Sequence, residues 1–207
     1  MWIKICGLKQ PENIARIADL KPAMMGFIFY PRSPRYAGGL DPRHVRALPA
    51  QIRRAGVFVD AKAEEILDTV RRYGLDTVQL HGEETPAFCE RIRREGLTVI
   101  KAVGIAVSDD IRKTDEYHGA CDLLLFDTKS PARGGTGRRF DWTLLENYRE
   151  TTPFLLSGGI GAEHAEDLAA FSHPQCAGLD LNSRFETEPG VKDAEALRDF
   201  IRSVQKD

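Results

Sequence analysis

The sequence lacks long apolar runs, and this absence bears on membrane association. No stretch of the 207 residues approaches the roughly 20 apolar residues that a transmembrane helix needs. The first six residues, MWIKIC, form too short an apolar segment for a secretory signal, and a turn follows them directly. The sequence therefore predicts a protein without a membrane partner.

An excess of basic residues is also missing. The chain has 29 Lys and Arg against 31 Asp and Glu, which gives a formal net charge of -2. A general nucleic-acid binder usually carries a basic excess, so no nucleic-acid partner is expected. Hydrophobic residues make up 42% and charged residues 29% of the chain, a balance that allows a substantial core and local sites for small anions.

Cysteines are few and widely separated. The four, Cys6, Cys89, Cys121 and Cys176, match neither a zinc-binding spacing nor a CxxC redox pair. No metal site is expected, and the thiols are expected to be free in a reducing cytoplasm. Three of them are expected to be small buried hydrophobes, whereas Cys6 directly precedes a glycine at the end of a predicted strand.

The sequence does contain a regular alternation of short apolar segments with helical patterns. Segments suited to buried strands lie at 3–6, 24–30, 54–59, 77–80, 97–103, 120–126, 154–156 and 177–181. Helices are expected at 11–20, 41–48, 63–73, 85–94, 108–115, 142–148, 163–171 and 193–204. Such alternation is typical of a parallel sheet with right-handed crossovers. Eight units without a linker predict an α/β protein, a single-domain (β/α)8 TIM barrel over residues 1–207, rather than an open doubly wound sheet.

The stretch from Leu123 to Gly137, LLLFDTKSPARGGTG, combines a buried strand with a polar loop. The apolar run ends at a single acid, Asp127, and Pro131 with three glycines prevents the strand from continuing. Asp127 thus stands where a strand passes into a backbone rich in free N–H groups, which suits a proton donor close to an anion. An aspartate after a strand is also a common start of a turn, and this alternative stays open for Asp127 taken alone.

Reactive or anion-binding residues follow most of the predicted strands. In a barrel of this type the active site lies at the carboxyl ends of the strands, so these residues would converge on one rim. They are Cys6, Arg32, Arg35, Asp60, His81, Asp127, Ser157, Gly158, Gly159, Asp180, Asn182 and Ser183, and Gly104 also ends a strand. Any one of them could be a turn residue, but their convergence on one rim indicates a site.

The loops after the seventh and eighth strands are the usual phosphate site of this fold. Residues 157–161, SGGIG, offer backbone N–H groups close to a following helix, whose N-terminus favours an anion. Gly134 and Gly135 could approach the same ligand from the neighbouring loop. The alternative for Gly158 and Gly159 is a tight turn between strand and helix. The expected partner is therefore a small phosphorylated molecule.

Cys6 and Asp127 end the first and sixth strands and would face each other across the barrel mouth. A thiolate can take a proton from carbon and a carboxylic acid can give one to oxygen, so the pair suits an isomerisation without a cofactor. Arg35 is a candidate carboxylate-binding residue, because a guanidinium can donate two parallel hydrogen bonds to a carboxylate. Alternatives stay open: a buried small hydrophobe for Cys6, a solvated loop arginine for Arg35, and a core histidine for His81.

Seven segments of the sequence resemble those of phosphoribosylanthranilate isomerase. They run from end to end in the expected order: KICG at 4–7, GFIFYPRSPRY at 26–36, GVFVD at 56–60, VQLHGEE at 78–84, FDTKSPARGGTGRRFDW at 126–142, LSGGI at 156–160 and LDLNSRFE at 179–186. The resemblance implies an aldose–ketose isomerase of tryptophan biosynthesis. Its reaction is the Amadori rearrangement of N-(5-phosphoribosyl)anthranilate to 1-(2-carboxyphenylamino)-1-deoxyribulose 5-phosphate.

The resemblance also implies roles for individual residues. Asp127 would protonate the ribose ring oxygen and open the ring, and Cys6 would remove the C2 proton of the Schiff base that results. Arg35 would hold the anthranilate carboxylate, and Asp180 would contact sugar hydroxyls. His81 is a further expected substrate-binding residue.

The phosphate would be held by the Gly158-Gly159 loop and by the start of the helix after the eighth strand, where Ser183 lies. One residue departs from the family pattern there. Arg184 stands where many members have a glycine, and an arginine would add a cation near the phosphate.

Three other functions fit the sequence less well. The histidine-pathway isomerase, which catalyses a similar Amadori reaction, would want an aspartate where this chain has Cys6. A Schiff-base lyase would need a lysine at a strand end, whereas Lys4 and Lys101 lie within strands. A barrel that only binds a phosphorylated ligand or a protein would not need an acid and a base. The exposed faces indicate no particular oligomeric state.

Overall fold

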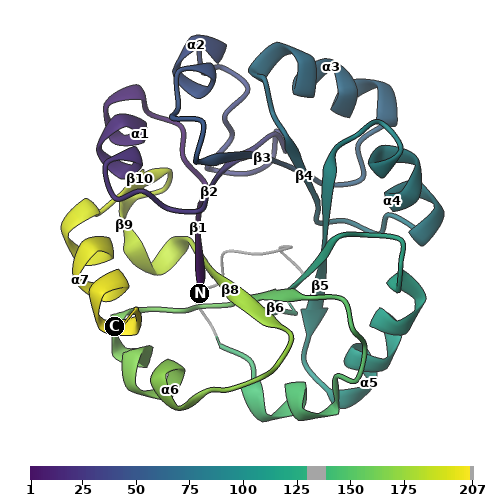
Figure 1. Ribbon diagram of the computed structural model, residues 1–207. Helices are drawn as coiled ribbons and strands as arrows, with labels where there is room; N and C mark the ends of the chain where they lie inside the picture. Colours follow the sequence, from purple (N-terminus) through teal and green to yellow (C-terminus); the bar gives the residue numbers. More distant parts are fainter. Residues whose placement is uncertain (130–138, 206–207) are drawn as a thin grey trace.

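A computed structural model describes residues 1–129 and 139–205 of the chain. Within these residues, eight parallel strands form a closed barrel in the order β1 to β8, with β8 paired to β1 (Figure 1). The strands are β1 (Trp2–Cys6), β2 (Met24–Ile28), β3 (Arg53–Phe58), β4 (Thr77–Leu80), β5 (Thr98–Ile105), β6 (Leu123–Thr128), β7 (Phe154–Leu156) and β8 (Cys176–Leu181). The closed barrel confirms the predicted (β/α)8 fold.

Helices surround the barrel, as Figure 1 shows. The α-helices are α1 (Pro11–Ala18), α2 (Pro42–Arg46), α3 (Ala63–Tyr73), α4 (Pro86–Arg93), α5 (Ser108–Arg112), α6 (Ala165–Ala170) and α7 (Ala194–Val204), and the 3-10 helices are η1 (Lys113–Tyr117), η2 (Trp142–Asn147), η3 (Ala162–His164) and η4 (Ser183–Phe185). Local signals position several of them. The Asp41 side chain accepts the backbone N–H of Arg43 at 2.9 Å, and Pro42 occupies the first turn of α2.

The segment after β6 differs from the α-helix predicted at 142–148. Residues Trp142–Asn147 form the 3-10 helix η2 instead. Trp142, Leu145 and Tyr148 are buried at intervals of three residues, which matches the three residues per turn of a 3-10 helix. Sequence periodicity over so short a segment does not separate the two helix types.

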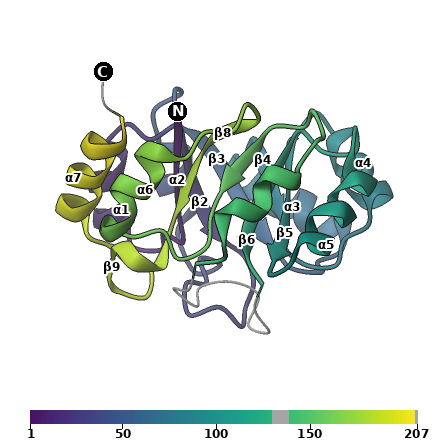
Figure 2. The same cartoon turned by 90° about the horizontal axis from the view of Figure 1, so that it is seen from below.

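A short antiparallel hairpin after β8 was not among the predicted elements. It pairs β9 (Glu186–Glu188) with β10 (Val191–Lys192), and Gly190 lies between them with a φ of 91°. Such short, charged strands have no alternating apolar pattern, so periodicity does not reveal them. Figure 2 shows β9 at the end of the barrel opposite the N-terminus.

Side chains alternate between two layers along each strand. Those that point outwards pack against the helices in a large apolar cluster, to which Ile3 and Ile5 of β1 belong. Those that point inwards form a smaller cluster of Met24, Ala55, Ile100, Ala102, Leu123, Leu125 and Leu155. By the same alternation, Lys4 and Cys6 of β1 point into the barrel, and Asp127 follows Leu125 on the inner face of β6. The predicted acid and base therefore face the same interior.

The four cysteines are free thiols in the described part of the chain, as their spacing predicted. Cys6, Cys89 and Cys121 are buried, whereas the expectation that Cys176 is buried was wrong, because this residue is partly exposed at the start of β8. Among the described residues, no helix combines the length and the apolar character that crossing a membrane requires.

Candidate active site

A pocket of about 320 Å³ opens at the carboxyl ends of the strands. Ten residues were expected to act in catalysis or substrate binding, and eight of them line the pocket: Cys6, Arg35, His81, Asp127, Gly158, Gly159, Asp180 and Ser183. The other two, Gly134 and Gly135, lie outside the described residues. The barrel topology thus brings strand ends that are distant in the sequence to one cavity.

Asp127 lies nearly buried on the inner face of β6 and contacts a histidine. Its Oδ1 accepts the backbone N–H of Thr128 at 2.8 Å, and its Oδ2 lies 3.4 Å from Nε2 of His81. Nδ1 of His81 lies 3.1 Å from Nε2 of Gln79, two residues earlier in the chain. With Gln79 donating to Nδ1, a neutral His81 carries its proton on Nε2, where it faces Asp127. His81 therefore orients the predicted acid.

Gly158 lies directly against the acid and has a φ of 90°. A Cβ at this position would lie 2.4 Å from Oγ1 of Thr128 and 3.3 Å from Oδ1 of Asp127. The backbone conformation and the close approach both require glycine. The turn after β7 thus places its backbone beside Asp127.

Gly158→Ala is expected to lower kcat/KM by roughly 10- to 100-fold, because the added methyl group displaces Thr128 and with it the acid. Steady-state kinetics beside a thermal melt would check this. Gly96→Ala is the matched control, because Gly96 has a φ of 79° but open space around its Cβ position. Equal losses in the two variants would contradict the steric explanation.

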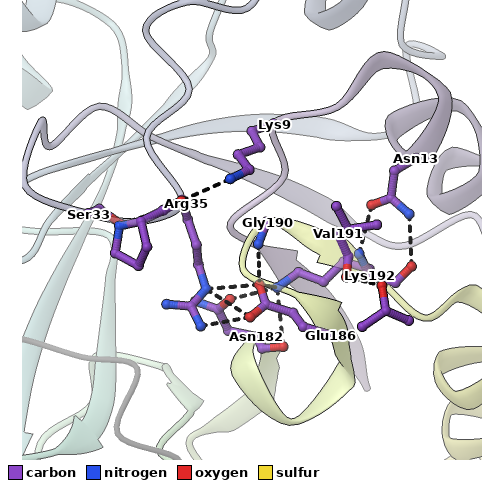
Figure 3. A network of polar contacts seen from close by, with 11 residues as sticks. Lys9, Asn13, Ser33, Arg35, Asn182, Glu186, Gly190, Val191 and Lys192 are labelled. Atoms are coloured by element: carbon purple, nitrogen blue, oxygen red, sulfur yellow. Dashed lines mark hydrogen bonds and ion pairs between the residues drawn. The ribbon is translucent and has the colours of Figure 1, made fainter.

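Arg35 is held in a polar network instead of extending into solvent (Figure 3). Its Nε and Nη2 donate to the two carboxylate oxygens of Glu186 at 2.9 and 2.7 Å, and its side chain is 12% exposed. Nη1 makes no hydrogen bond to any described residue, and the side chain lines the pocket. The bidentate pair therefore fixes the guanidinium while leaving donors for an anion.

Lys192 of β10 holds this network together (Figure 3). Its Nζ donates to Oδ1 of Asn182 at 2.6 Å and to Oε1 of Glu186 at 2.7 Å. Burial lowers the pKa of Lys192 to about 8, and the Glu186 carboxylate acts against that change. Asn13 accepts the backbone N–H of Lys192 and donates to its carbonyl. The unpredicted hairpin thus supplies the partners that position Arg35.

Cys6 is buried at the end of β1, against Gly26 of β2. A Cβ on Gly26 would lie 2.6 Å from Sγ of Cys6, so the glycine provides the space that the thiol occupies. Lys4 places its Nζ 2.7 Å from Oδ1 of Asp180 on β8, and Ser157 Oγ donates to Oδ2 of Asp180 at 3.3 Å. Burial raises the pKa of the Cys6 thiol, and the Lys4 ammonium acts against that increase.

The predicted phosphate cradle follows β7 and β8. Gly159 has a φ of 67°, and the helix predicted at 163–171 begins as the 3-10 helix η3 before continuing as α6. Ser183 begins η4 and lines the pocket. The guanidinium of Arg184 donates to the carboxylate of Glu163. This ion pair offsets the charge that the arginine was expected to add near the loop.

Sequence reasoning missed several polar residues that support the site. Lys4 was excluded as a Schiff-base lysine because it lies within a strand, and no role was predicted for Gln79, Glu186 or Lys192. Lys4 and Gln79 could have been found from the alternation of side chains along a strand. Each lies two residues before a predicted site residue and therefore on the same inner face of the barrel. Glu186 and Lys192 gave no such signal, because they belong to the short hairpin.

Comparisons with known proteins show the family. The family model for N-(5'-phosphoribosyl)anthranilate (PRA) isomerase matches residues 3–203. The chain is 45% identical over 206 residues to the N-(5'-phosphoribosyl)anthranilate isomerase of Parabacteroides distasonis, covering 99% of this chain and 93% of that one.

Solved structures give the same result. The phosphoribosyl anthranilate isomerase of Thermotoga maritima superposes with a TM-score of 0.84 at 34% identity, over 99% of this chain and 98% of that one. A phosphoribosyl anthranilate isomerase solved in complex with reduced 1-(o-carboxyphenylamino)-1-deoxyribulose 5-phosphate gives a TM-score of 0.82 at 31% identity, with the same coverage. From its motifs, its barrel and these relatives, the chain belongs to the N-(5'-phosphoribosyl)anthranilate isomerase family.

Proposed function

We propose that Cys6 and Asp127 are the general base and general acid for the isomerisation of N-(5-phosphoribosyl)anthranilate to 1-(2-carboxyphenylamino)-1-deoxyribulose 5-phosphate in tryptophan biosynthesis. The observation that carries this proposal is the single pocket that these side chains share with Arg35 and the Gly158-Gly159 turn. The substrate needs one proton donor, one proton acceptor and binding groups for a carboxylate and a phosphate. Proton transfers alone interconvert the isomers, so the reaction proceeds without a cofactor.

Asp127 acts first in this scheme. Its protonated carboxyl gives a proton to the ribose ring oxygen, the C1–O bond breaks, and the anilino nitrogen supplies the electron pair that forms the C1=N Schiff base. His81 and the backbone N–H of Thr128 then face the carboxylate that is left.

Cys6 acts second. Its thiolate takes the proton from C2, the electron pair of the C–H bond forms the C1=C2 double bond, and the C1=N electrons return to nitrogen. The resulting enolamine tautomerises to the ketone, with the oxygen on C2 losing its proton and C1 gaining one. Cys6 ends as a neutral thiol, and deprotonation restores it for the next turnover.

The two ends of the substrate are bound on either side of the base. Arg35 follows β2, the Gly158-Gly159 turn follows β7, and Cys6 of β1 lies between them in the barrel order. The fixed guanidinium suits the anthranilate carboxylate, and the glycine turn with Ser183 suits the phosphate. Asp180 lines the pocket and is assigned to the sugar hydroxyls. Binding both ends holds C2 beside the base.

The test is the fluorescence of freshly generated N-(5-phosphoribosyl)anthranilate after the purified protein is added. The anthranilate-type fluorescence is expected to fall without any added cofactor. The corresponding Amadori substrate of histidine biosynthesis, offered in parallel, is expected to stay unchanged. A folded protein that leaves the first substrate intact would overturn the proposed function.

Arg35→Ala is expected to raise KM by roughly 10- to 100-fold with a smaller effect on kcat, because a charge-assisted hydrogen bond to the carboxylate is lost in the ground state as well as in the transition state. Initial rates over a range of substrate concentrations separate the two constants. Arg43→Ala on α2 is the control, because Arg43 is an exposed arginine paired only with Asp41 among the described residues. An unchanged KM in Arg35→Ala would contradict the assignment.

A cytoplasmic location is part of the same proposal. It is supported by the free state of the four thiols in the described part of the chain, which suits a reducing compartment.

A further inference from the structure

We propose that Lys4 is a positioning residue whose buried ammonium stabilises the thiolate of Cys6, and that Asp180 holds this ammonium in place. The inference rests on the proposed role of Cys6 as the base. Lys4 touches no reacting atom in this scheme and acts through the sulfur.

The strand geometry places the two side chains together. Ile3 and Ile5 pack outwards against the helices, so Lys4 and Cys6 both point into the barrel from β1. Lys4 is paired in register with Asp180 on β8, and its Nζ lies 2.7 Å from Oδ1 of that residue. Lys4 also lies two residues before Cys6 on the same inner face, and its ammonium acts to lower the pKa of the Cys6 thiol. Asp180 thus fixes the ammonium beside the proposed base.

A counter-charge is needed because the thiol is only 3% exposed. Removal from water disfavours the charged form, so an isolated buried thiol would stay protonated. The groups that act on Cys6 are the Lys4 ammonium from β1, the Asp180 carboxylate from β8 and the Lys192 ammonium from β10. On the remaining side, β2 presents Gly26, which carries no charge. Burial is the largest influence and raises the pKa of Cys6. The Lys4 ammonium acts most strongly in the opposite direction, and the Asp180 carboxylate also raises the pKa of Cys6.

The two ammonium groups have different tasks. Lys192 is engaged with Asn182 and Glu186 in the network that holds Arg35. Lys4 lies two residues before Cys6 on the inner face of β1 and has Asp180 as its carboxylate partner. It keeps its proton throughout the cycle, because the thiolate receives its proton from C2 of the substrate. Lys4 therefore stabilises the reactive form of the base without exchanging a proton.

The test is a pH titration of the Cys6 thiolate, followed by its ultraviolet absorbance as the difference between each protein and its Cys6→Ala counterpart. Lys4→Met is expected to move the Cys6 midpoint upward by about one to three pH units, the usual effect of removing an opposite charge. Turnover near neutral pH should fall by about tenfold for each unit, and activity should recover as the pH rises. A purely structural role would not move the midpoint.

Lys101→Met is the matched control. Lys101 is as deeply buried as Lys4 and is also ion-paired, with its Nζ 2.9 Å from Oε2 of Glu84. It lies on the outer face of β5, between the inward-pointing Ile100 and Ala102. Its replacement should leave the Cys6 midpoint unchanged. A folded Lys4→Met protein with the midpoint of the parent would overturn the inference.

Lys4→Met leaves Asp180 buried without its cation, so a second variant guards against misfolding. The pair Lys4→Met/Asp180→Asn removes both charges, and its midpoint should lie above that of Asp180→Asn alone, because only the double variant lacks the Lys4 ammonium. A midpoint equal to or below that of Asp180→Asn would overturn the inference. If neither variant folds, the same question can be asked of the parent protein by nuclear magnetic resonance. The Nζ resonance of labelled Lys4 should shift as Cys6 titrates, and it should stay fixed in Cys6→Ala. A parent resonance that does not shift would overturn the inference.

The titration needs no turnover, so the two proposals are tested separately. If the fluorescence assay shows no turnover but the Cys6 midpoint depends on Lys4, the proposed function is overturned and the interaction between the two residues stands. If the assay shows turnover but the Cys6 midpoint is the same with and without Lys4, only the inference about Lys4 is overturned.

Discussion

Replacing Asp127 by asparagine should lower kcat by about 100- to 10,000-fold, the usual contribution of a general acid. The amide has nearly the same shape as the carboxyl and can still accept the Thr128 N–H, so the pocket should keep its form. It cannot deliver the proton that the ribose ring oxygen needs when the C1–O bond breaks. The fluorescence assay measures the loss directly, and a thermal melt establishes that the variant is folded.

Asp122→Asn is the control for the acid. Asp122 directly precedes β6, at the end opposite Asp127, where it accepts the backbone N–H of Val99 and pairs with Arg93. Its replacement can reduce stability but removes nothing from the pocket. An Asp127→Asn protein that keeps more than about a tenth of the parent kcat would remove Asp127 as the acid. Activity lost equally in both variants would point to folding instead of chemistry.

Replacing Cys6 by alanine should also lower kcat by about 100- to 10,000-fold while leaving ligand affinity largely intact. The small side chain leaves a gap beside Gly26 but does not disturb Arg35 or the Gly158-Gly159 turn, which hold the two ends of the ligand in the proposed scheme. The loss should therefore fall on proton transfer and not on binding. Single-turnover rates and calorimetric binding of the reduced product analogue would measure the two separately.

Cys89→Ala provides the comparison for the base. Cys89 is a fully buried thiol on α4, in the apolar layer between helices and barrel. Its replacement removes the same atoms but should leave turnover close to that of the parent. Unchanged turnover in Cys6→Ala would exclude Cys6 as the base, and weakened analogue binding would show that the thiol also shapes the pocket.

The residues at strand ends could be predicted because two simple regularities place them. Apolar runs of strand length alternate with helical patterns, and a parallel barrel gathers the carboxyl ends of its strands at one rim. Cys6, His81 and Asp127 each follow such a run directly, so their convergence follows from topology alone. Gly158 and Gly159 were predicted from their position after the seventh strand, and the structure gives both a left-handed backbone.

The partners of these residues could not be predicted, because they are distant in the chain. Arg35 and Glu186 are separated by 151 residues, and Lys4 and Asp180 by 176. No local pattern encodes which buried acid meets which buried base. The same holds for the hairpin β9–β10, whose short strands are specified by contacts with Asn13 and Asn182 and not by periodicity.

By itself, the sequence determined the barrel, the rim on which the site lies, the family and the residues expected to transfer protons. These depend on alternation, strand length and turn chemistry, which act over a few neighbouring residues. Only the tertiary structure decided how those residues are held: Arg35 by Glu186, Asp127 by His81, and Cys6 beside the Lys4–Asp180 pair. Burial of charged groups is favourable only when opposite charges meet at hydrogen-bond distance, and that distance is set by the closure of the barrel.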